Sequence, residues 1–281
     1  MAEKKWQHII PNGYLKAWGD KEFKFKTPHV WLYNCESHFP IDKPTSNKIF
    51  TEKNYYTIYD TEGIRNLEIE DAFARHEEDF YKIRDEKLFQ NKEIYTDEQN
   101  KLCIFIAIML NRTEVGIDYI KNIFVNMNKN IDESLIVRKN NELIDYDRIQ
   151  QIADTPVEYG LKLFIEEIAP QLTLLDIRVY TTTDKIGFIT SDNPCIWHDL
   201  KSPLNHFGAG TNSESLNILL PISPNHCIVM KPKINDTILF GYENIDERPE
   251  LLKEINRLIY SKSYKYYISN SNSFNKEIFC N

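Results

Sequence analysis

The sequence predicts an α+β fold, with a mostly antiparallel or mixed sheet built from the C-terminal half and the N-terminal strands. A helical segment at residues 66–170 is expected to cover that sheet, because apolar residues there recur at steps of three and four. The last third instead alternates apolar and polar residues, as half-buried strands do. No internal repeat or low-complexity tract interrupts the chain, so residues 1–281 are expected to form a single domain.

Short strands and turns are expected in the first third of the chain. Residues 30–34 (VWLYN) have the composition of a buried strand, and residues 55–60 (YYTIYD) that of a second strand. Pro40 and Pro44 punctuate the connection between the two strands.

The first helix of this segment is expected to carry an apolar stripe with a charged stripe beside it. The apolar stripe consists of Ile69, Phe73, His76, Phe80 and Ile83. Glu70, Glu77 and Arg84 are spaced by seven and form a second stripe at its margin. His76 lies at the centre of the apolar stripe, so we interpret it as a packing residue.

Three more helices are expected before residue 170. Thr96 as N-cap with Gln99 three positions later is the capping-box pattern, and this helix runs to Arg112. A third helix follows around residues 117–131, and a fourth ends at Pro170 because proline disrupts a helix interior.

The last third is expected to form hairpins. Residues 174–182 read as a strand that pairs with residues 185–190, and residues 216–222 as a strand that pairs with 226–231 across Ser-Pro-Asn. A helix over 248–261 and a short strand ending at Ser269 complete the pattern.

Charge and cysteine content limit the function classes. A formal net charge of −8 argues against a protein that coats duplex nucleic acid with its whole surface. This charge does not exclude nucleic-acid binding in a small basic cleft, formed by residues 21–26 (KEFKFK) or 262–267 (KSYKYY). The same alternation of lysine and aromatic residues is also typical of strands that expose lysines to solvent. Five cysteines lack framework spacing and no signal peptide opens the chain, so a cytoplasmic protein with reduced thiols is expected.

Several known site types do not match the sequence. The longest apolar run, residues 102–110, is about half of what a bilayer requires, so no membrane partner is expected. Cys35 and His38 have the spacing of half a zinc site, but no second pair completes it. Walker A and G-x-G-x-x-G loops are absent, and Ser-Asp-Asn at 191–193 lacks the other β-lactamase elements.

Two charged residues remain as candidates. Arg112 ends an apolar helix, and a buried cation requires an anion, for which Glu70 and Glu77 are the natural partners. Asp192 lies where a strand ends in a turn, directly before Asn193 and a proline. Such a position displays functional side chains, but an aspartate there also commonly caps its own turn.

His8 has two interpretations. As a lone histidine beside Ile9, Ile10 and Pro11, it fits a half-buried core residue. The extended chain before the proline also holds its ring in place, and we expect that ring to meet a carboxylate.

The segment Gln7–Trp18 (QHIIPNGYLKAW) resembles the opening of a bacterial family catalogued as domain of unknown function 4238. Agreement continues, in order, through NYY at 54–56, the Glu-rich helix with Glu70 and Glu77, NRT at 111–113, FITSDNP at 188–194, LPISP at 220–224 and NRLIYS at 256–261. Two departures are Trp18 for the usual Phe and Glu114 for the usual Pro, and the second is expected to loosen the helix end around Arg112. The resemblance implies recurrent polar positions, but no activity, at Gln7, His8, Glu77, Arg112, Asp192 and Asn193.

Two functions follow as hypotheses. The first is a hydrolase acting on nucleic acid, an RNase or DNase of a defence or toxin system, with His8 as general base or acid. Glu77 and Asp192 would orient His8 or hold a Mg²⁺-type ion, and Arg112 would neutralise a phosphate oxygen. Gln7, Asn193, Lys262 and Lys265 would contact the substrate, and residues 198–215 would act as a lid.

The second hypothesis is a non-catalytic binding or sensing module. The same polar residues would form a structural network, and the chain would bind a ligand, a protein partner or a second copy of itself. This hypothesis predicts that substitution of His8 or Arg112 lowers stability, because each change leaves a buried partner unpaired.

Overall fold

The computed structural model describes residues 6–19, 28–46, 48–59, 64–130, 138–139, 142–143, 158, 160, 162, 164–201, 210–233 and 240–272. The basic stretch 21–26 and residues 202–209 of the expected lid lie outside the described residues.

The first third forms short elements. They are β1 (Trp6–His8), α1 (Asn12–Leu15), η1 (Lys16–Trp18), β2 (His29–Asn34), β3 (Pro40–Pro44), β4 (Thr51–Lys53), β5 (Ile58–Tyr59) and β6 (Arg65–Asn66). The expected strand at 30–34 is confirmed as β2. The expected strand at 55–60 is reduced to β5, because Tyr55 and Tyr56 belong to a turn.

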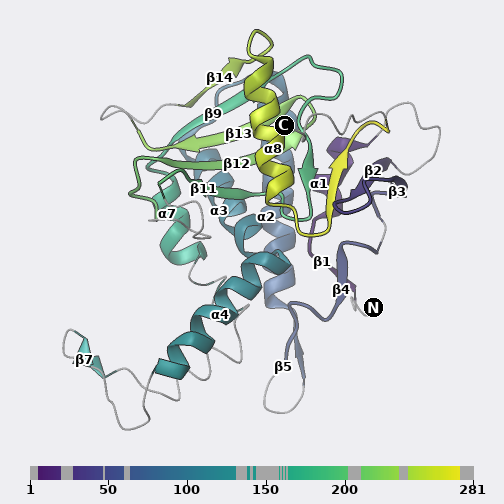
Figure 1. The fold of residues 1–281 in the computed structure, drawn as a ribbon. Helices are drawn as coiled ribbons and strands as arrows, with labels where there is room; N and C mark the ends of the chain where they lie inside the picture. The colour runs from purple at the N-terminus through teal and green to yellow at the C-terminus, as the bar shows by residue number, and fades with distance from the viewer. Residues whose placement is uncertain are drawn as a thin grey trace.

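The helical segment and the strands after it complete the chain (Figure 1). Its helices are α2 (Glu68–Glu86), η2 (Leu88–Gln90), α3 (Thr96–Asn111), α4 (Glu114–Asn130), the π-helical turn η3 (Phe164–Ile168) and α7 (Ala169–Leu172), with β7 (Arg138–Lys139) and β8 (Glu142–Leu143) between α4 and η3. Then follow β9 (Asp176–Thr181), β10 (Thr190–Ser191), β11 (Ile196–Asp199), β12 (Leu216–Ser223), β13 (His226–Lys231), β14 (Phe240–Asn244), α8 (Pro249–Ser261) and β15 (Tyr266–Ser269).

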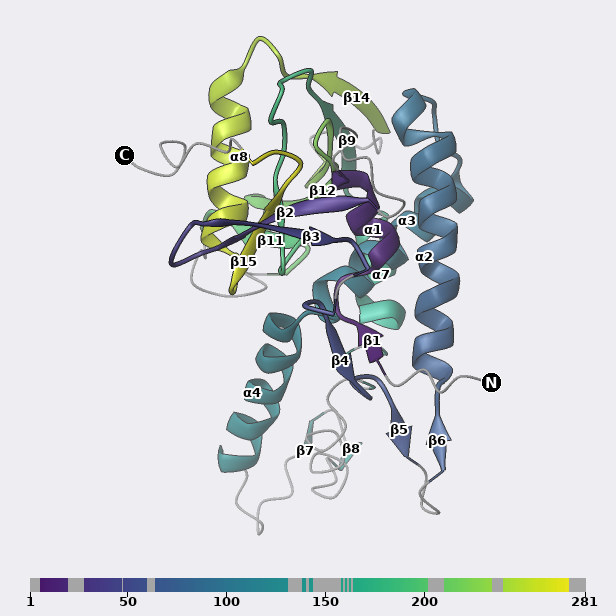
Figure 2. The same ribbon diagram turned by 90° about the vertical axis from the view of Figure 1, so that its right-hand side faces the viewer.

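The larger sheet lies between two helical layers. Its strand order is β11-β12-β13-β9-β14, with only β14 parallel to its neighbour. One face packs against α8 through Leu252, Ile255 and Ile259, and the other faces α3 and α7 (Figure 2). The apolar run 102–110 is buried there, as a helix covered on all sides must be. The α+β prediction with a covering helical segment is therefore confirmed.

The smaller sheet joins the two ends of the chain. Its order is β10-β15-β2-β3, all antiparallel, so the last strand pairs with an N-terminal one. The aromatic run after β1 attaches to both sheets, because the buried Tyr14 hydroxyl donates to Pro221 O (2.5 Å) and bonds Thr190 Oγ1 (2.7 Å).

The predicted hairpin between residues 174–182 and 185–190 is wrong, because residues 185–189 form no strand, whereas the hairpin of β12 and β13 is confirmed. Strand β9 pairs with β13 and β14 instead. Gly187 has φ +66° and directs the chain away, so that Phe188 N donates to Pro224 O (2.7 Å) and Ile189 N to Asn256 Oδ1 (3.1 Å).

Two helix boundaries also differ from prediction. The N-cap of α3 is Tyr95 and not Thr96, and its backbone N–H donates to Glu98 Oε2 (2.8 Å). Pro170 does not end the helix, because it occupies the first turn of α7, where a missing N–H removes no hydrogen bond.

Candidate functional site

Arg112 is the centre of a buried polar cluster, called here the Arg112 network. Its side chain is only 2% exposed, Nη1 donates to Glu77 Oε1 (2.7 Å), and Nη2 donates to the carbonyl oxygen of His8 (2.6 Å). The guanidinium also lies 4.6 Å from the ring centroid of Phe73. The predicted pairing of Arg112 with an α2 glutamate is confirmed, and α3 is thereby fastened to α2 and to the end of β1.

Gln7 extends the network toward the start of α2. Its amide nitrogen donates to Glu70 Oε2 (2.7 Å) and to Thr57 Oγ1 (3.1 Å). Its amide oxygen accepts the backbone N–H of Tyr56 (2.6 Å), and the Tyr56 hydroxyl donates to Arg112 O (2.9 Å). Gln7 is buried and its amide is committed to these protein partners, so it does not present a free side chain to a substrate.

The ring of His8 lies at the edge of this network. It is partly buried, and burial lowers its pKa, with Glu77 and Glu70 acting to raise the pKa and Arg112 to lower it. His8 is therefore mainly neutral at neutral pH. What Arg112 binds is the backbone carbonyl of His8, and not its ring.

The ionisation of the network follows from its contacts. Burial acts to lower the pKa of Arg112, but the combined effect of Glu77 and Tyr56 outweighs burial, so the pKa is raised. Burial raises the pKa of Tyr56 to about 12, and the Tyr81 hydroxyl donates to Glu77 Oε2 (3.3 Å). Arg112 therefore stays charged across the physiological range.

Asp192 fixes the start of β15. Its carboxylate accepts the backbone N–H groups of Tyr264 (2.8 Å), Lys265 (2.6 Å) and Tyr266 (2.8 Å), which lie 72 to 74 residues further along the chain. Burial raises its pKa, and these three hydrogen bonds oppose the shift. The local turn is closed by Ser191 instead, whose Oγ accepts the N–H of Asn193 (3.1 Å).

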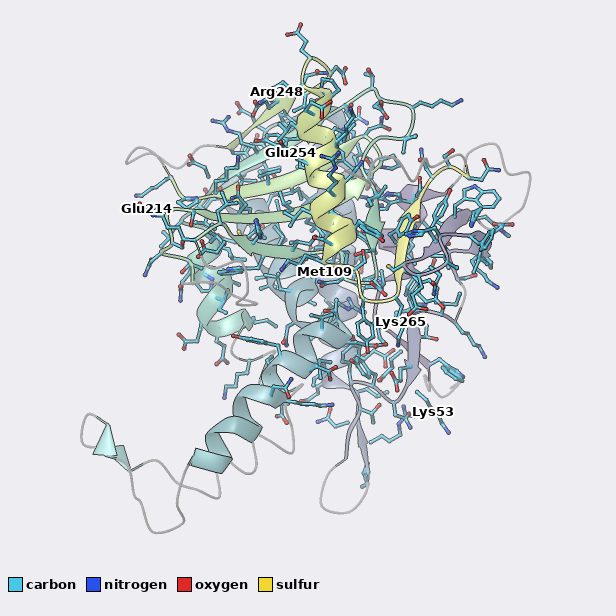
Figure 3. The ribbon with its side chains drawn as sticks, viewed as in Figure 1. Lys53, Met109, Glu214, Arg248, Glu254 and Lys265 are labelled. Carbon is cyan, nitrogen blue, oxygen red and sulfur yellow. The ribbon has the colours of Figure 1, made fainter. Side chains whose placement is uncertain are left out.

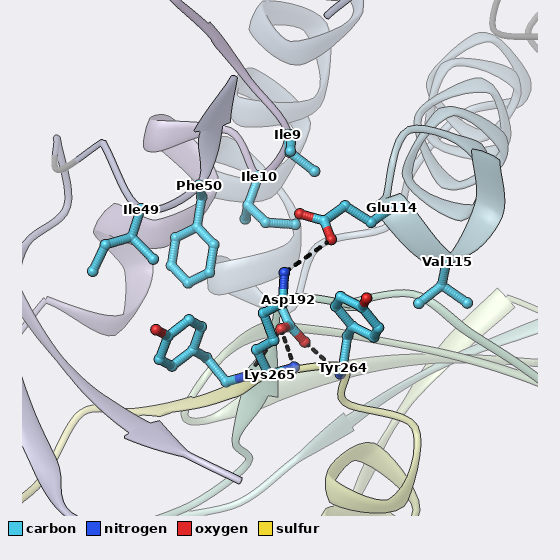
Figure 4. A pocket seen from close by; sticks show the side chains of 10 residues that line it. Ile9, Ile10, Ile49, Phe50, Glu114, Val115, Asp192, Tyr264 and Lys265 are labelled. Atoms are coloured by element: carbon cyan, nitrogen blue, oxygen red, sulfur yellow. Dashed lines mark hydrogen bonds and ion pairs between the residues drawn. The ribbon is translucent and has the colours of Figure 1, made fainter. Parts of the chain in front are cut away.

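A cavity of about 230 Å³ lies in front of Asp192 and is called here the Asp192 pocket (Figure 4). Glu114 Oε2 and Lys265 Nζ form an ion pair across it (3.3 Å), and Lys265 also lies over the Tyr264 ring, 4.6 Å from its centroid. Figure 3 shows Lys265 beside β15, near the joint between α3 and α4. The pocket is lined by Ile9, Ile10, Ile49, Phe50, Glu114, Val115, Asp192, Tyr264, Lys265 and Tyr266.

The predicted site residues are thus divided between two neighbouring places. His8, Glu77 and Arg112 come together in the network, whereas Asp192 and Lys265 line the pocket, which none of those three lines. The two places share their supporting chain segments. Ile9 and Ile10 directly follow His8, and Glu114 is separated from Arg112 by a single residue.

Asn193 and Lys262, the other two predicted substrate contacts, meet at the end of α8. The Asn193 amide nitrogen donates to the backbone carbonyl of Lys262 (3.0 Å), and Asn193 is buried. This contact attaches the turn after β10 to the C-terminus of α8, and neither residue lines the Asp192 pocket.

No group of three or more His, Cys, Asp or Glu side chains is arranged to hold a metal ion within the described part of the chain. Glu77 and Asp192, the residues considered for a Mg²⁺-type ion, have separate partners, namely Arg112 and the N–H groups of β15. Among the described helices, none is both long and apolar enough to cross a membrane.

Several functional positions carry no strong sequence signal. Tyr56, Thr57 and Tyr81 join the network through hydrogen bonds that no spacing reveals. Glu114 directly follows the motif NRT and Tyr264 lies within KSYKYY, so these two positions do carry a local sequence signal.

The joint between α3 and α4 is tight despite the unusual Glu114. Thr113 Oγ1 accepts the N–H of Gly116 (3.2 Å) and so caps α4, which places Glu114 in its first turn. An acidic residue is favourable at that end of a helix, as proline is at the first helical position. The expected loosening around Arg112 is therefore wrong, since Arg112 retains both side-chain hydrogen bonds.

Comparison with known proteins gives one match. The family described as protein of unknown function (DUF4238) matches residues 6–273, nearly the whole chain. No curated protein and no solved structure matches. The match begins at β1 and includes the network, the Asp192 pocket and both sheets. The chain belongs to the DUF4238 family.

Proposed function

We propose that this protein is a binding or sensing module that takes a small ligand into the Asp192 pocket. The observation that carries the proposal is the position of Arg112, whose two hydrogen bonds fix the chain segments that continue into the pocket walls. In this function Arg112, Glu77 and Asp192 are positioning residues, because both Nη atoms of Arg112 and the carboxylates of Glu77 and Asp192 already bind groups of the protein.

The pocket chemistry favours a flat, apolar ligand that carries a cationic or hydrogen-bond-donating group. Phe50, Tyr264 and Tyr266 supply aromatic surface. The rings of Phe50 and Tyr266 lie edge to face, with their centroids 6.2 Å apart. Two carboxylates, Glu114 and Asp192, face one ammonium, Lys265, so the formal charge of the lining is −1 by this count. A phosphate backbone is disfavoured there.

Lys265 indicates where a ligand cation would sit. Its ammonium already combines a carboxylate partner, Glu114, with the face of Tyr264, an arrangement that also suits a ligand amine. The side chain is more than half exposed, so it can turn into solvent when a ligand enters.

A fragment screen by ligand-observed NMR tests this function, using benzylamine, benzyl alcohol and benzoate as a matched series. We expect benzylamine to bind best, to weaken in Glu114→Gln, and to be lost in Val115→Trp, which fills the pocket. Glu214→Gln removes an 89% exposed carboxylate outside the pocket lining and is the matched control. A screen without pocket binders, or binders that Val115→Trp leaves unchanged, would reject the proposal.

A second candidate function, the nucleic-acid hydrolase, is favoured by one observation. His8 is a half-buried histidine with a lowered pKa, and Glu77 and Glu70 act on it electrostatically, as suits a general base. Incubation of labelled RNA and DNA with the protein, with and without Mg²⁺, tests it. Cleavage that persists in both His8→Ala and Asp192→Ala, with folding intact, would reject the catalytic assignment.

A further inference from the structure

A second cavity, of about 270 Å³, lies on the face of the larger sheet that α8 covers and is called here the sheet–helix pocket. Three polar residues form a row across adjacent strands at one side. His198 of β11 is paired in register with Asn217 of β12, and Lys231 of β13 lies next in the same row. The row stands beyond the apolar part of this sheet face, where Leu219 and Val229 pack under α8.

The remaining walls of this pocket are apolar. Leu251, Ile255 and Leu258 lie on one face of α8, as spacings of four and three require, and Leu200 contributes a 66% exposed side chain. A cavity of this volume suits a short aliphatic chain.

The polar row has unused binding capacity. The Lys231 ammonium donates to the Tyr180 hydroxyl (3.3 Å), but no carboxylate of the described residues forms an ion pair with it. The Nδ1 atom of His198 is buried without a hydrogen-bond partner among the residues that the structure describes. Asn217 uses its amide nitrogen for Ser215 O (3.2 Å).

Two residues of opposite charge outside the pocket lining, Lys262 and Asp199, act on His198. Burial lowers the pKa of His198, Lys262 lowers it further, and Asp199 opposes them. The only lining carboxylate among those described is Glu254, an exposed residue on α8, labelled in Figure 3. A ligand with a negatively charged head is therefore attracted to the strand side, where Lys231 lies, and is repelled by Glu254 on the helix side.

We propose that the sheet–helix pocket binds an amphipathic carboxylate, with its head at the row His198, Asn217 and Lys231 and its aliphatic chain against α8. This site is separate from the Asp192 pocket, with which it shares no lining residue. It therefore stands whether or not the proposed function does.

Isothermal titration calorimetry with sodium octanoate, 1-octanol and octylamine tests the proposal. We expect octanoate to bind tightest and to weaken about tenfold in Lys231→Met, the effect of losing one charge-assisted hydrogen bond. Glu254→Gln is expected to strengthen octanoate binding about twofold, because an exposed like charge is removed. Octanol binding should change little in both variants.

Two controls make the result specific to this site. Lys233→Met removes an exposed lysine two residues away that does not line the pocket, and Glu114→Gln alters only the Asp192 pocket. Neither should change octanoate affinity. The proposal is overturned if octanoate does not bind the folded protein, if octylamine binds more tightly, or if Lys231→Met and Lys233→Met give equal affinities.

Discussion

Replacement of Arg112 by methionine tests whether the Arg112 network holds the fold together. Methionine keeps most of the apolar contact with Phe73, so the change mainly removes the charge and its two hydrogen bonds, to Glu77 (2.7 Å) and to His8 O (2.6 Å). The buried partners left behind then determine the loss of stability.

The magnitude follows from burial. Removing one partner of a buried ion pair costs about 3–5 kcal/mol. Arg112 is 2% exposed but Glu77 is 21% exposed, so water recovers part of the interaction after the substitution. We therefore expect a loss of about 3 kcal/mol in the free energy of unfolding, toward the lower end of that range.

Urea denaturation followed by circular dichroism measures this loss. Lys201→Met is the matched control, because it breaks the Lys201–Glu214 pair, whose side chains are 70% and 89% exposed, and such pairs contribute about 0–1 kcal/mol. A double-mutant cycle with Glu77→Gln isolates the pair itself. If Arg112→Met destabilises the protein no more than Lys201→Met does, the structural role of the network is refuted.

Three further predictions concern buried or ionised groups outside that pair. Tyr14→Phe should lower the free energy of unfolding by about 1–3 kcal/mol, because Thr190 and the Pro221 carbonyl lose their buried partner, and urea midpoints check this against wild type. Hydrogen bonds from Thr183 and neighbouring groups lower the pKa of Asp246 to about 2, so its stabilisation is present above the ordinary pKa and is lost as the pH falls toward 2. Melting temperatures of Asp246→Asn should thus fall below wild type at pH 5 and converge with it near pH 2, and an equal gap at both values would contradict the assignment. Burial lowers the pKa of His8 in the folded state, so the unfolded state binds a proton more readily and wild type should lose stability as the pH falls below the ordinary histidine pKa of 6.5. His8→Gln should flatten this dependence between about pH 7.5 and 5.5 in urea titrations.

Part of the candidate site could be read from the sequence because it depends on local pattern and charge. An arginine at the end of an apolar helix must meet an anion, and the stripe containing Glu70 and Glu77 gave the two choices. The same stripe logic places Arg84 correctly at the edge of the core, where its Nη1 donates to Gly13 O (3.0 Å).

Other parts of the site could not be read from the sequence, because hydrogen-bond partners far along the chain have no local signature. Nothing near Asp192 indicates that its carboxylate accepts the N–H groups of Tyr264, Lys265 and Tyr266. The sequence also does not show that residues 7–10 separate the Arg112 network from the Asp192 pocket. Arg112 binds the carbonyl of His8, whereas Ile9 and Ile10 line the pocket, and this arrangement follows only from the packing of the folded chain.

The sequence by itself determined the α+β class, helices α2, α3, α4 and α8, and strands β9, β12, β13 and β15, because periodicity reflects which side chains must leave water. Strands β11 and β14 were not predicted from it. Only the tertiary structure decided the strand order. Strand β9 joins β13 and β14, and β15 returns to β2, since sheet hydrogen bonds are exchanged between segments that share no neighbouring sequence. The same long-range pairing turned Asp192 and Arg112 from separate charged residues into supports of one pocket.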